Sequence, residues 1–372
     1  MSYRTIILGA GFTGLAAGIK TGATIYEKSK DAGGICRAYW KNGFQFSVGG
    51  GHWIFGKGIG LEYIKSLVQL KEIERNAGIY FNHTFPYPFQ TIAQKEDPVT
   101  VGSLKSWLSG NFSREECNIF FNPFNDKYTA GLYDEVIQHD EYKTPPAGGV
   151  GFVPKFYDPV RGLDHLVNIM ADKCNIEYGK EAVLIDPENK EVFFTDNTSV
   201  KYDKLITTIP LKYTMMMCGQ VQDLPYTSVF VLNIGAYPDA NTPQEHWLYI
   251  PYSKTGFYRV GFYSNVDNKK APSGMISLSV EMAFRSDVDD KTFDFESLSN
   301  RIIDELQAWR FIGDVVTIDP TFVKCAYTWL RDKDEPARHI DWLKERDIVS
   351  TGRYGSWKFC GFTQSIEMGL SV

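Results

Sequence analysis

The feature that most constrains the fold is a glycine-rich turn near the N-terminus. The turn, Gly9-Ala10-Gly11-Phe12-Thr13-Gly14, follows an apolar run at residues 4–8 and precedes small residues that predict a helix to about Lys20. A second apolar run at residues 23–27 completes a predicted strand–helix–strand unit. In such a unit, glycines permit the tight turn and let backbone amides approach a pyrophosphate at the helix N-terminus. An ordinary glycine-rich turn is the alternative, because the motif alone is weakly specific.

Two neighbouring features favour FAD over NAD as the bound dinucleotide. Glu27 ends the second predicted strand, near the place where a carboxylate accepts both ribose hydroxyls, although it could also be a solvent-exposed glutamate beside Lys28. The pair Gly33-Gly34 would let the next backbone segment run along the pyrophosphate and the ribityl chain, an element that NAD-binding domains usually lack. The residues expected to contact FAD in this region are Gly9, Gly11, Phe12, Thr13, Gly14, Glu27, Lys28, Gly33 and Gly34.

Glycine is concentrated in the first 60 residues, which hold 14 of the 33 glycines. Three of them, Gly49-Gly50-Gly51, directly precede His52, so backbone rather than side chains would lie against a flat ligand. A histidine on its own is more often structural than catalytic. The triple glycine nevertheless favours a loop on the flavin face, with Gly50, Gly51 and His52 at the cofactor.

The C-terminal region carries another glycine cluster, Thr351-Gly352-Arg353-Tyr354-Gly355, followed by a predicted helix. A helix N-terminus directed at the flavin pyrimidine would stabilise negative charge on the reduced flavin. A turn that only closes the fold is the alternative. The residues placed at the cofactor from this half of the chain are Val183, Gly352, Arg353, Gln364 and Ser365.

Residues 225–285 are rich in Tyr, Phe, Val and Ile and are interrupted by Pro and Gly, which predicts an antiparallel sheet. Within it, Arg259 lies in the aromatic run 257–265. This arginine is either a ladder residue on the sheet surface or a bidentate ligand for phosphate. An amphipathic helix is predicted to follow, with Phe295, Leu298, Ile302, Leu306 and Trp309 on one face.

Together these patterns predict an α/β fold: a discontinuous Rossmann-type FAD-binding domain, an inserted helical segment and an antiparallel β-sheet substrate domain. The expected domains are residues 1–60, 150–215 and 320–372 for FAD binding, 61–149 for the mainly helical insertion, and 216–319 for the substrate domain. Other expected elements are helices over 60–72 and 161–173, a capping box at 113–116, a loop at 145–149, a β-meander over 183–209 and a strand at 347–350.

Composition argues against several classes of protein. The net charge of −6 and the pI near 5.6 disfavour a nucleic-acid binder. The six cysteines form no C-x-x-C pair, which is typical of reduced cytosolic thiols and not of a metal site. No run of 18 apolar residues occurs, and the apolar segment 6–19 lacks the features of a signal peptide. We expect a cytoplasmic protein that acts on a small molecule, without a membrane or nucleic-acid partner.

Several segments, in this order, resemble UDP-galactopyranose mutases and their relatives in the flavin amine-oxidase superfamily. Phe44 to Phe55 (FQFSVGGGHWIF) is similar to the G-G-H-V-I-F histidine loop of eukaryotic-type mutases, with one extra residue. Phe257 to Asn265 (FYRVGFYSN) is close to F-Y-R-x-x-x-F-S-N. Gly352 to Phe359 (GRYGSWKF) is close to G-R-F-G-S-W-R-Y, and Leu205 to Pro210 matches the strand before the superfamily's substrate domain. The resemblance spans the whole chain.

The resemblance implies an FAD enzyme that acts on a nucleotide sugar. In that family N5 of the reduced flavin attacks the anomeric carbon and displaces UDP, and the sugar ring opens and recloses before UDP returns. NAD(P)H would serve as the external reductant. By position, Arg259 matches one of two arginines that hold the diphosphate and His52 matches the histidine near N5. Tyr327 lies near a tyrosine that reaches the diphosphate.

The chain departs from the family pattern at the second phosphate arginine. The corresponding stretch, Leu132 to Thr144, contains no arginine, and the candidates to replace it are Lys127, Lys143 and Arg161. Phe359 also replaces a tyrosine expected at the diphosphate. Two other hypotheses therefore stay open. One is an FAD-dependent oxidoreductase of the amine-oxidase type that removes hydride from an amine or a C–H bond, and the other is a flavin-binding protein without catalysis.

Overall fold

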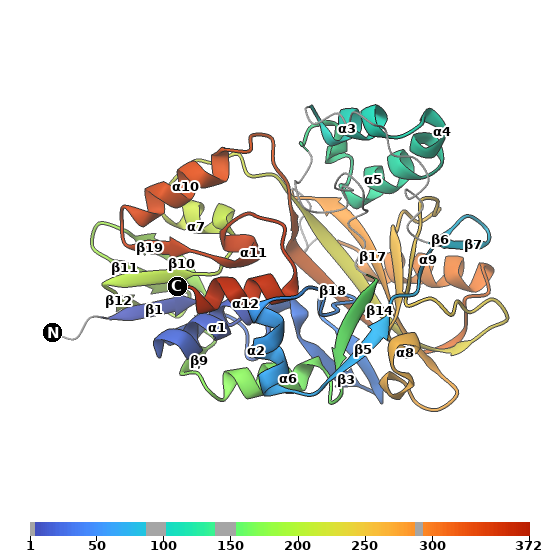
Figure 1. Ribbon diagram of the computed structural model, residues 1–372, viewed down its shortest axis with the longest axis horizontal. Helices are drawn as coiled ribbons and strands as arrows, with labels where there is room; N and C mark the ends of the chain where they lie inside the picture. The colour runs from blue at the N-terminus through green and yellow to red at the C-terminus, as the bar shows by residue number, and fades with distance from the viewer. Residues whose placement is uncertain (1–3, 87–101, 138–153, 287–292) are drawn as a thin grey trace.

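The computed structural model describes residues 4–86, 102–137, 154–286 and 293–372 (Figure 1). The predicted strand–helix–strand unit is present as β1 (Thr5–Leu8), α1 (Phe12–Thr21) and β2 (Thr24–Glu27). Five strands form a parallel sheet in the order β19-β13-β1-β2-β9. The other three are β9 (Ile176–Tyr178), β13 (Lys204–Thr207) and β19 (Ile348–Ser350). The sheet therefore joins the start, the middle and the end of the sequence, as a Rossmann-type unit requires.

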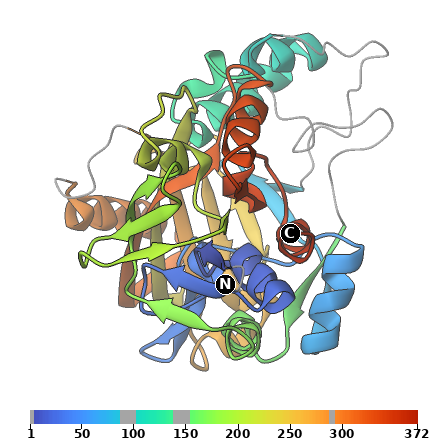
Figure 2. The same cartoon turned by 90° about the vertical axis from the view of Figure 1, so that its left-hand side faces the viewer.

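The C-terminal helix closes this unit. Helix α12 (Phe362–Leu370) lies beside α1 in Figures 1 and 2. A Cβ on Gly369 would come within 2.2 Å of the Thr13 carbonyl oxygen, so glycine at this position lets the two helices touch. The N-terminal turn and the C-terminal segment consequently form one structural body.

The second large element is a mixed seven-stranded sheet in the order β18-β14-β17-β16-β15-β6-β7. Neighbouring strands are antiparallel except β15 and β6, which are parallel. The strands are β6 (Ala77–Tyr80), β7 (Thr84–Pro86), β14 (Tyr226–Pro238), β15 (Trp247–Tyr249), β16 (Arg259–Phe262), β17 (Ile276–Arg285) and β18 (Ile312–Thr328). The predicted amphipathic helix is α9 (Phe295–Ala308), and its Leu298, Ile302 and Leu306 are buried against one face of this sheet.

Short helices cover the opposite face of the large sheet, at the upper right of Figure 1. They are α3 (Leu104–Asn111), α4 (Arg114–Glu116) and α5 (Asn122–Tyr128), with a π-helical turn at Cys117–Phe121. Phe124 and Tyr128 pack against Tyr258, next to the start of β16. The predicted capping box is confirmed, because the Ser113 hydroxyl accepts the Glu116 amide and the Glu116 carboxylate accepts the Ser113 amide.

Smaller elements connect these layers. They are β3 (Ala38–Lys41), β4 (Phe44–Ser47), α2 (Ile59–Leu67), β5 (Leu70–Glu74), β8 (Lys155–Pro159), α6 (Leu163–Ala171), β10 (Ala182–Asp186), β11 (Glu191–Phe194), β12 (Ser199–Lys201), α7 (Leu211–Met217), α8 (Tyr263–Val266), α10 (Glu335–Lys344) and α11 (Gly352–Gly355). Within the described ranges, every helix is too short or too polar to span a bilayer. The loop expected at 145–149 lies outside the described residues.

Two predicted elements end differently in the structure. The helix expected over 60–72 stops at Leu67, because Val68 is extended and residues 70–74 pair as β5 with β8. The β-meander expected over 183–209 contains only β10, β11 and β12. Its expected last strand, β13, leaves the meander and pairs in parallel with β1 and β19. Leu205 and Ile206 are fully buried on opposite faces of the parallel sheet. A short apolar run of this kind occurs in buried strands of many sheets, so the sequence of this strand does not indicate which strands it pairs with.

The large sheet crosses the expected domain limits. Strands β6 and β7 come from the segment expected to be mainly helical, and they extend the large sheet through the parallel pairing of β6 with β15. Strand β18 runs from Ile312 to Thr328, through the expected boundary between residues 319 and 320. The division into three domains stays a prediction, with the large sheet as their shared element.

Candidate functional site

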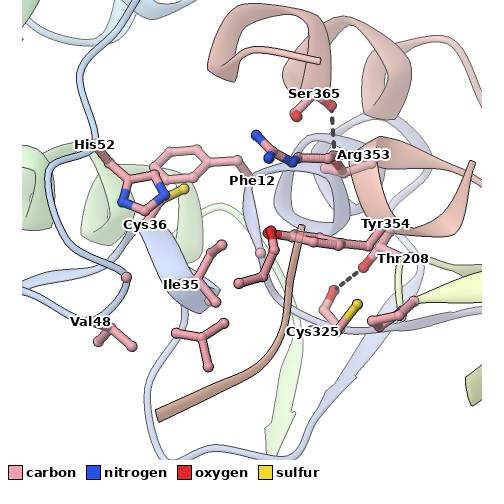
Figure 3. Close-up of a pocket in the computed structure, with 18 of the residues that line it drawn as sticks. Phe12, Ile35, Cys36, Val48, His52, Thr208, Cys325, Arg353, Tyr354 and Ser365 are labelled. Carbon is pink, nitrogen blue, oxygen red and sulfur yellow. Dashed lines mark hydrogen bonds between the residues drawn. The ribbon is translucent and has the colours of Figure 1, made fainter. Parts of the chain in front are cut away.

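A cavity of about 1830 Å³ lies between the parallel sheet and the large sheet (Figure 3). Ligand pockets usually measure roughly 300–1,000 Å³, so this cleft has room for a large cofactor and a second molecule. Most of the predicted site residues line it: Gly9, Gly11, Phe12, Thr13, Glu27, Lys28, Gly33, Gly34, Gly51, His52, Val183, Arg259, Tyr327, Arg353, Gln364 and Ser365. The predicted residues Gly14, Gly50 and Gly352 do not line the cavity. The cleft therefore brings together motifs from both ends of the sequence, from Gly9 to Ser365.

The glycine turn presents backbone donors to the cleft. A Cβ on Gly14 would lie 1.8 Å from the Gly9 carbonyl oxygen, so the turn closes only with glycine at that position. A Cβ on Gly11, in contrast, would meet no atom within 4 Å and would point into open space. Helix α1 begins at Phe12 without a side-chain cap, so its first amides remain available to an anion.

Glu27 is fixed at the end of β2 and is 7% exposed. Its Oε2 accepts the Ala10 amide at 2.7 Å, and its Oε1 accepts the Ser29 amide at 2.8 Å. The Gly33 amide donates to the Ala10 carbonyl at 2.8 Å, so the paired-glycine loop is attached to the same turn. Gly33 has φ +101°, a left-handed conformation that favours glycine. The solvated alternative for Glu27 is thus wrong, while Lys28 beside it is exposed.

His52 is held as a neutral imidazole at the edge of the cleft. Burial lowers its pKa from 6.5 to about 4 against the opposing effect of a hydrogen bond to Gly50, and the positive charges of Arg259 and Arg353 lower the pKa further. Its Nδ1 lies 3.0 Å from the Gly50 carbonyl oxygen. Because a carbonyl only accepts, Nδ1 carries the proton, which leaves Nε2 as an acceptor at neutral pH.

Arg259 forms a bidentate ion pair with Glu281, which the sequence reasoning missed. Arg259 Nε donates to Oε1 at 2.8 Å and Nη2 to Oε2 at 2.5 Å, while the Tyr258 hydroxyl donates to Oε2 at 3.0 Å. Burial opposes the charged guanidinium, but Glu281 together with the neighbouring tyrosines raises the pKa of Arg259 well above its ordinary value. Arg259 is therefore not an exposed residue on the sheet surface, and its positive charge is balanced by Glu281.

The register of the sheet explains this pair. Arg259 and Glu281 are directly opposite each other on β16 and β17. Glu281 is 2% exposed, and a Cβ on Gly50 would lie 2.6 Å from its Oε1, so the glycine loop before His52 lies directly on the carboxylate. The sequence contained one indication of a buried carboxylate here, because Glu281 is the single charged residue in the run 276–284.

Arg353 extends over the cavity toward Phe12 and His52 in Figure 3. Its Nη1 donates to the Cys360 carbonyl at 3.3 Å, and its Cζ lies 4.1 Å from the centre of the Phe359 ring. The Tyr327 and Tyr354 rings are each 5.6 Å from Cζ. Among the residues that the structure describes, Arg353 makes no ion pair, and its buried Nε has no hydrogen-bond partner.

The structure also tests the candidates for a second phosphate arginine. Lys127 donates to the Pro251 carbonyl and lines a separate cavity of about 510 Å³, and Arg161 is an exposed residue that does not line the main cleft. Lys143 lies outside the described residues. A cation that the sequence did not indicate, Arg75, lines the cleft with its Cζ 4.9 Å from the Trp247 ring.

The C-terminal motif is positioned by backbone contacts. Gly352 has φ +83°, and a Cβ there would lie 2.6 Å from Thr13 Oγ1, so glycine lets this segment approach α1. Gln364 Oε1 accepts the Gly361 amide at 2.7 Å, which caps α12, and Thr13 Oγ1 donates to the Ser365 carbonyl at 3.0 Å. The start of α12 therefore borders the same cleft as the start of α1.

The fold and the cleft define a class: a Rossmann-type parallel unit joined to a large mixed sheet, with the cavity between them. No protein-family model matches the chain. Among solved structures, the chain is similar to reduced UDP-galactopyranose mutase, with a TM-score of 0.84 and 21% identity over 100% of this chain and 93% of that one.

Two other solved structures are similar over nearly their whole length. A putrescine oxidase variant shares 14% identity with a TM-score of 0.66, covering 99% of this chain and 97% of that one. A fatty acid isomerase from P. acnes that produces CLA shares 12% identity with a TM-score of 0.65, covering 100% and 97%. The predicted α/β fold, and the predicted likeness of that fold to UDP-galactopyranose mutase, are thus confirmed.

Proposed function

We propose that this protein binds FAD and is a flavoenzyme. Three observations support the fit of the cofactor to the cleft. The uncapped start of α1 offers amide donors to a pyrophosphate, and Gly11 leaves the space beside them open. Buried Glu27 ends β2, where a ribose would lie. Gly49 and Gly51, in the loop before His52, line the same cavity.

The activity we propose is mutase-like, an interconversion of pyranose and furanose forms of a nucleotide sugar. The observation that carries it is the convergence of His52, Arg259 and Tyr327 on the cavity that also contains the dinucleotide turn. Bound FAD would supply, in its reduced form, the nucleophilic centre for redox-neutral exchange at the anomeric carbon. NAD(P)H is the reductant we propose.

Each of the three residues then has a specific task. Arg259 keeps its Nη1 without a hydrogen-bond partner in the described part of the chain, so it can donate to a phosphate oxygen while Glu281 orients the rest of the guanidinium. Tyr327 presents its ring to the same space beside Arg353. His52 Nε2 can accept a proton or a hydrogen bond from a sugar hydroxyl.

A second candidate is an FAD-dependent oxidoreductase that removes hydride from an amine or a C–H bond. An aromatic wall favours it, since Trp53, Phe55 and Trp247 all line the cavity. The neutral character of the Arg259–Glu281 pair is also compatible with a substrate that carries no phosphate.

The test is to reduce the purified yellow protein anaerobically and incubate it with UDP- and dTDP-sugars. Conversion of the pyranose form to the furanose form, measured by chromatography, would support the mutase proposal. Arg259→Ala should weaken UDP binding by roughly 1.5–3 kcal/mol, whereas Arg338→Ala, which removes an exposed arginine paired with Asp332, should not. If no sugar nucleotide binds and an amine bleaches the oxidised flavin, the protein is an oxidoreductase and the mutase proposal is wrong.

A further inference from the structure

The arginines that line the cleft differ in how their charge is balanced. Arg259 is paired with Glu281, and Arg37 is paired with Asp31. Arg353 has no carboxylate partner among the described residues, although its guanidinium lies within the cleft. The groups that surround it are the phenols of Tyr327 and Tyr354 and the thiols of Cys36 and Cys360.

These neighbours do not neutralise the charge. Burial raises the pKa of Cys36 to about 12, so its thiol stays protonated. Burial likewise raises the pKa of Tyr354 above its ordinary range. Burial disfavours the charged form of Arg353, but its pKa stays above the ordinary value for arginine, so the guanidinium remains a cation. A sheltered cation without a counter-ion costs several kcal/mol, which an anionic ligand would offset.

Phe359 holds this cation in place. The guanidinium lies 4.1 Å from the centre of the Phe359 ring, a cation–π contact that fixes its plane. Its Nη1 is directed to the Cys360 carbonyl, and its buried Nε is left with an unused N–H. The residue that departs from the mutase motif, phenylalanine in place of tyrosine, therefore contacts the guanidinium of Arg353.

We propose that Arg353 binds a phosphate group of the ligand in this cleft and that Phe359 is its positioning residue. Arg353 contributes a positive charge that no carboxylate among the described residues balances. The Arg259–Glu281 pair has no net charge and contributes only oriented N–H donors. The phosphate belongs either to a nucleoside diphosphate substrate or to the pyrophosphate of FAD. The first source rests on the proposed function, and the second requires only that the cofactor binds.

The experiment compares FAD-loaded Arg353→Gln with the wild type by calorimetric titration with UDP and by the FAD retained after dialysis. Loss of a charge-assisted hydrogen bond weakens binding roughly 10- to 100-fold. If the substrate is the source, UDP affinity falls by that factor and becomes less sensitive to salt, because one charge pair is gone. If FAD is the source, the variant loses flavin instead. Arg338→Gln makes the same change in net charge at an exposed site, and it should alter neither measurement.

The role of Phe359 has its own pair of variants. Phe359→Tyr keeps the aromatic face and should bind within about twofold of the wild type, while Phe359→Leu should reproduce part of the Arg353→Gln loss. Should Arg353→Gln fail to fold, as judged by its melting temperature, Arg353→Lys keeps the charge without the planar fork and should bind several-fold more weakly. Unchanged UDP affinity and unchanged flavin content in the folded variant would overturn the proposal. Intact UDP binding without sugar conversion would instead count against the mutase function alone.

Discussion

Replacing Glu281 by glutamine removes the negative charge beside Arg259 while nearly conserving the size of the side chain. The carboxylate is 2% exposed and accepts two hydrogen bonds from Arg259 and one from Tyr258. Leaving one partner of a buried ion pair without the other costs about 3–5 kcal/mol. For 372 residues, the unfolding entropy near 60 °C is roughly 0.8 kcal/mol per degree. We therefore expect Glu281→Gln to lower the melting temperature by about 4–6 °C.

Differential scanning calorimetry of the purified protein measures this shift. The control is the double variant Arg259→Met, Glu281→Met, which removes both charges and keeps apolar volume. Because a buried ion pair is often no more stable than well-packed apolar side chains, the double variant should recover most of the loss. Added phosphate should raise the melting temperature of Glu281→Gln more than that of the wild type, since the unbalanced Arg259 gains an anion. A Glu281→Gln protein that melts within 1 °C of the wild type would refute the reasoning.

Other consequences concern pH and the glycine turn. Burial lowers the pKa of His52 and of His246 from 6.5 to about 4, so the unfolded chain binds more protons between these values and stability falls as the pH falls through that window. Each histidine accounts for roughly 3 kcal/mol, and thermal melts from pH 7 to 4 should show a shallower decline for His52→Gln. Gly11→Ala should melt like the wild type but retain less FAD, because its methyl group enters the open cleft. Gly14→Ala, in contrast, should lower the melting temperature by several degrees, since its methyl group meets the Gly9 carbonyl oxygen; equal melting of the two alanine variants would contradict this.

The sequence determined the elements whose residues are neighbours in the chain. The turn from Gly9 to Gly14 lies between β1 and α1 as predicted, because its glycines and the flanking apolar runs act within one short segment. The same holds for the capping box at Ser113 and for the apolar face of α9. In each case the backbone conformation follows from local sterics and hydrogen bonds.

Pairings between distant segments were decided by the tertiary structure. The apolar run at 204–207 has the composition of any buried strand, and only the space between β1 and β19 gives it a parallel partner on each side. The contact of Glu281 with Arg259 depends on the register of two strands, and a shift by one residue would turn the carboxylate to the opposite face.

The same division applies to the candidate site. The motifs around Gly9, His52 and Arg353 indicated which segments line the cleft, because each motif requires a particular local backbone. The motifs did not indicate whether Arg259 or Arg353 has a carboxylate partner that balances its charge. Arg259 has a carboxylate partner and Arg353 has an aromatic one, and both partners are set by side-chain packing within the folded protein. Charge balance in a cleft is a sum over segments far apart in the sequence, so only the folded chain fixes it.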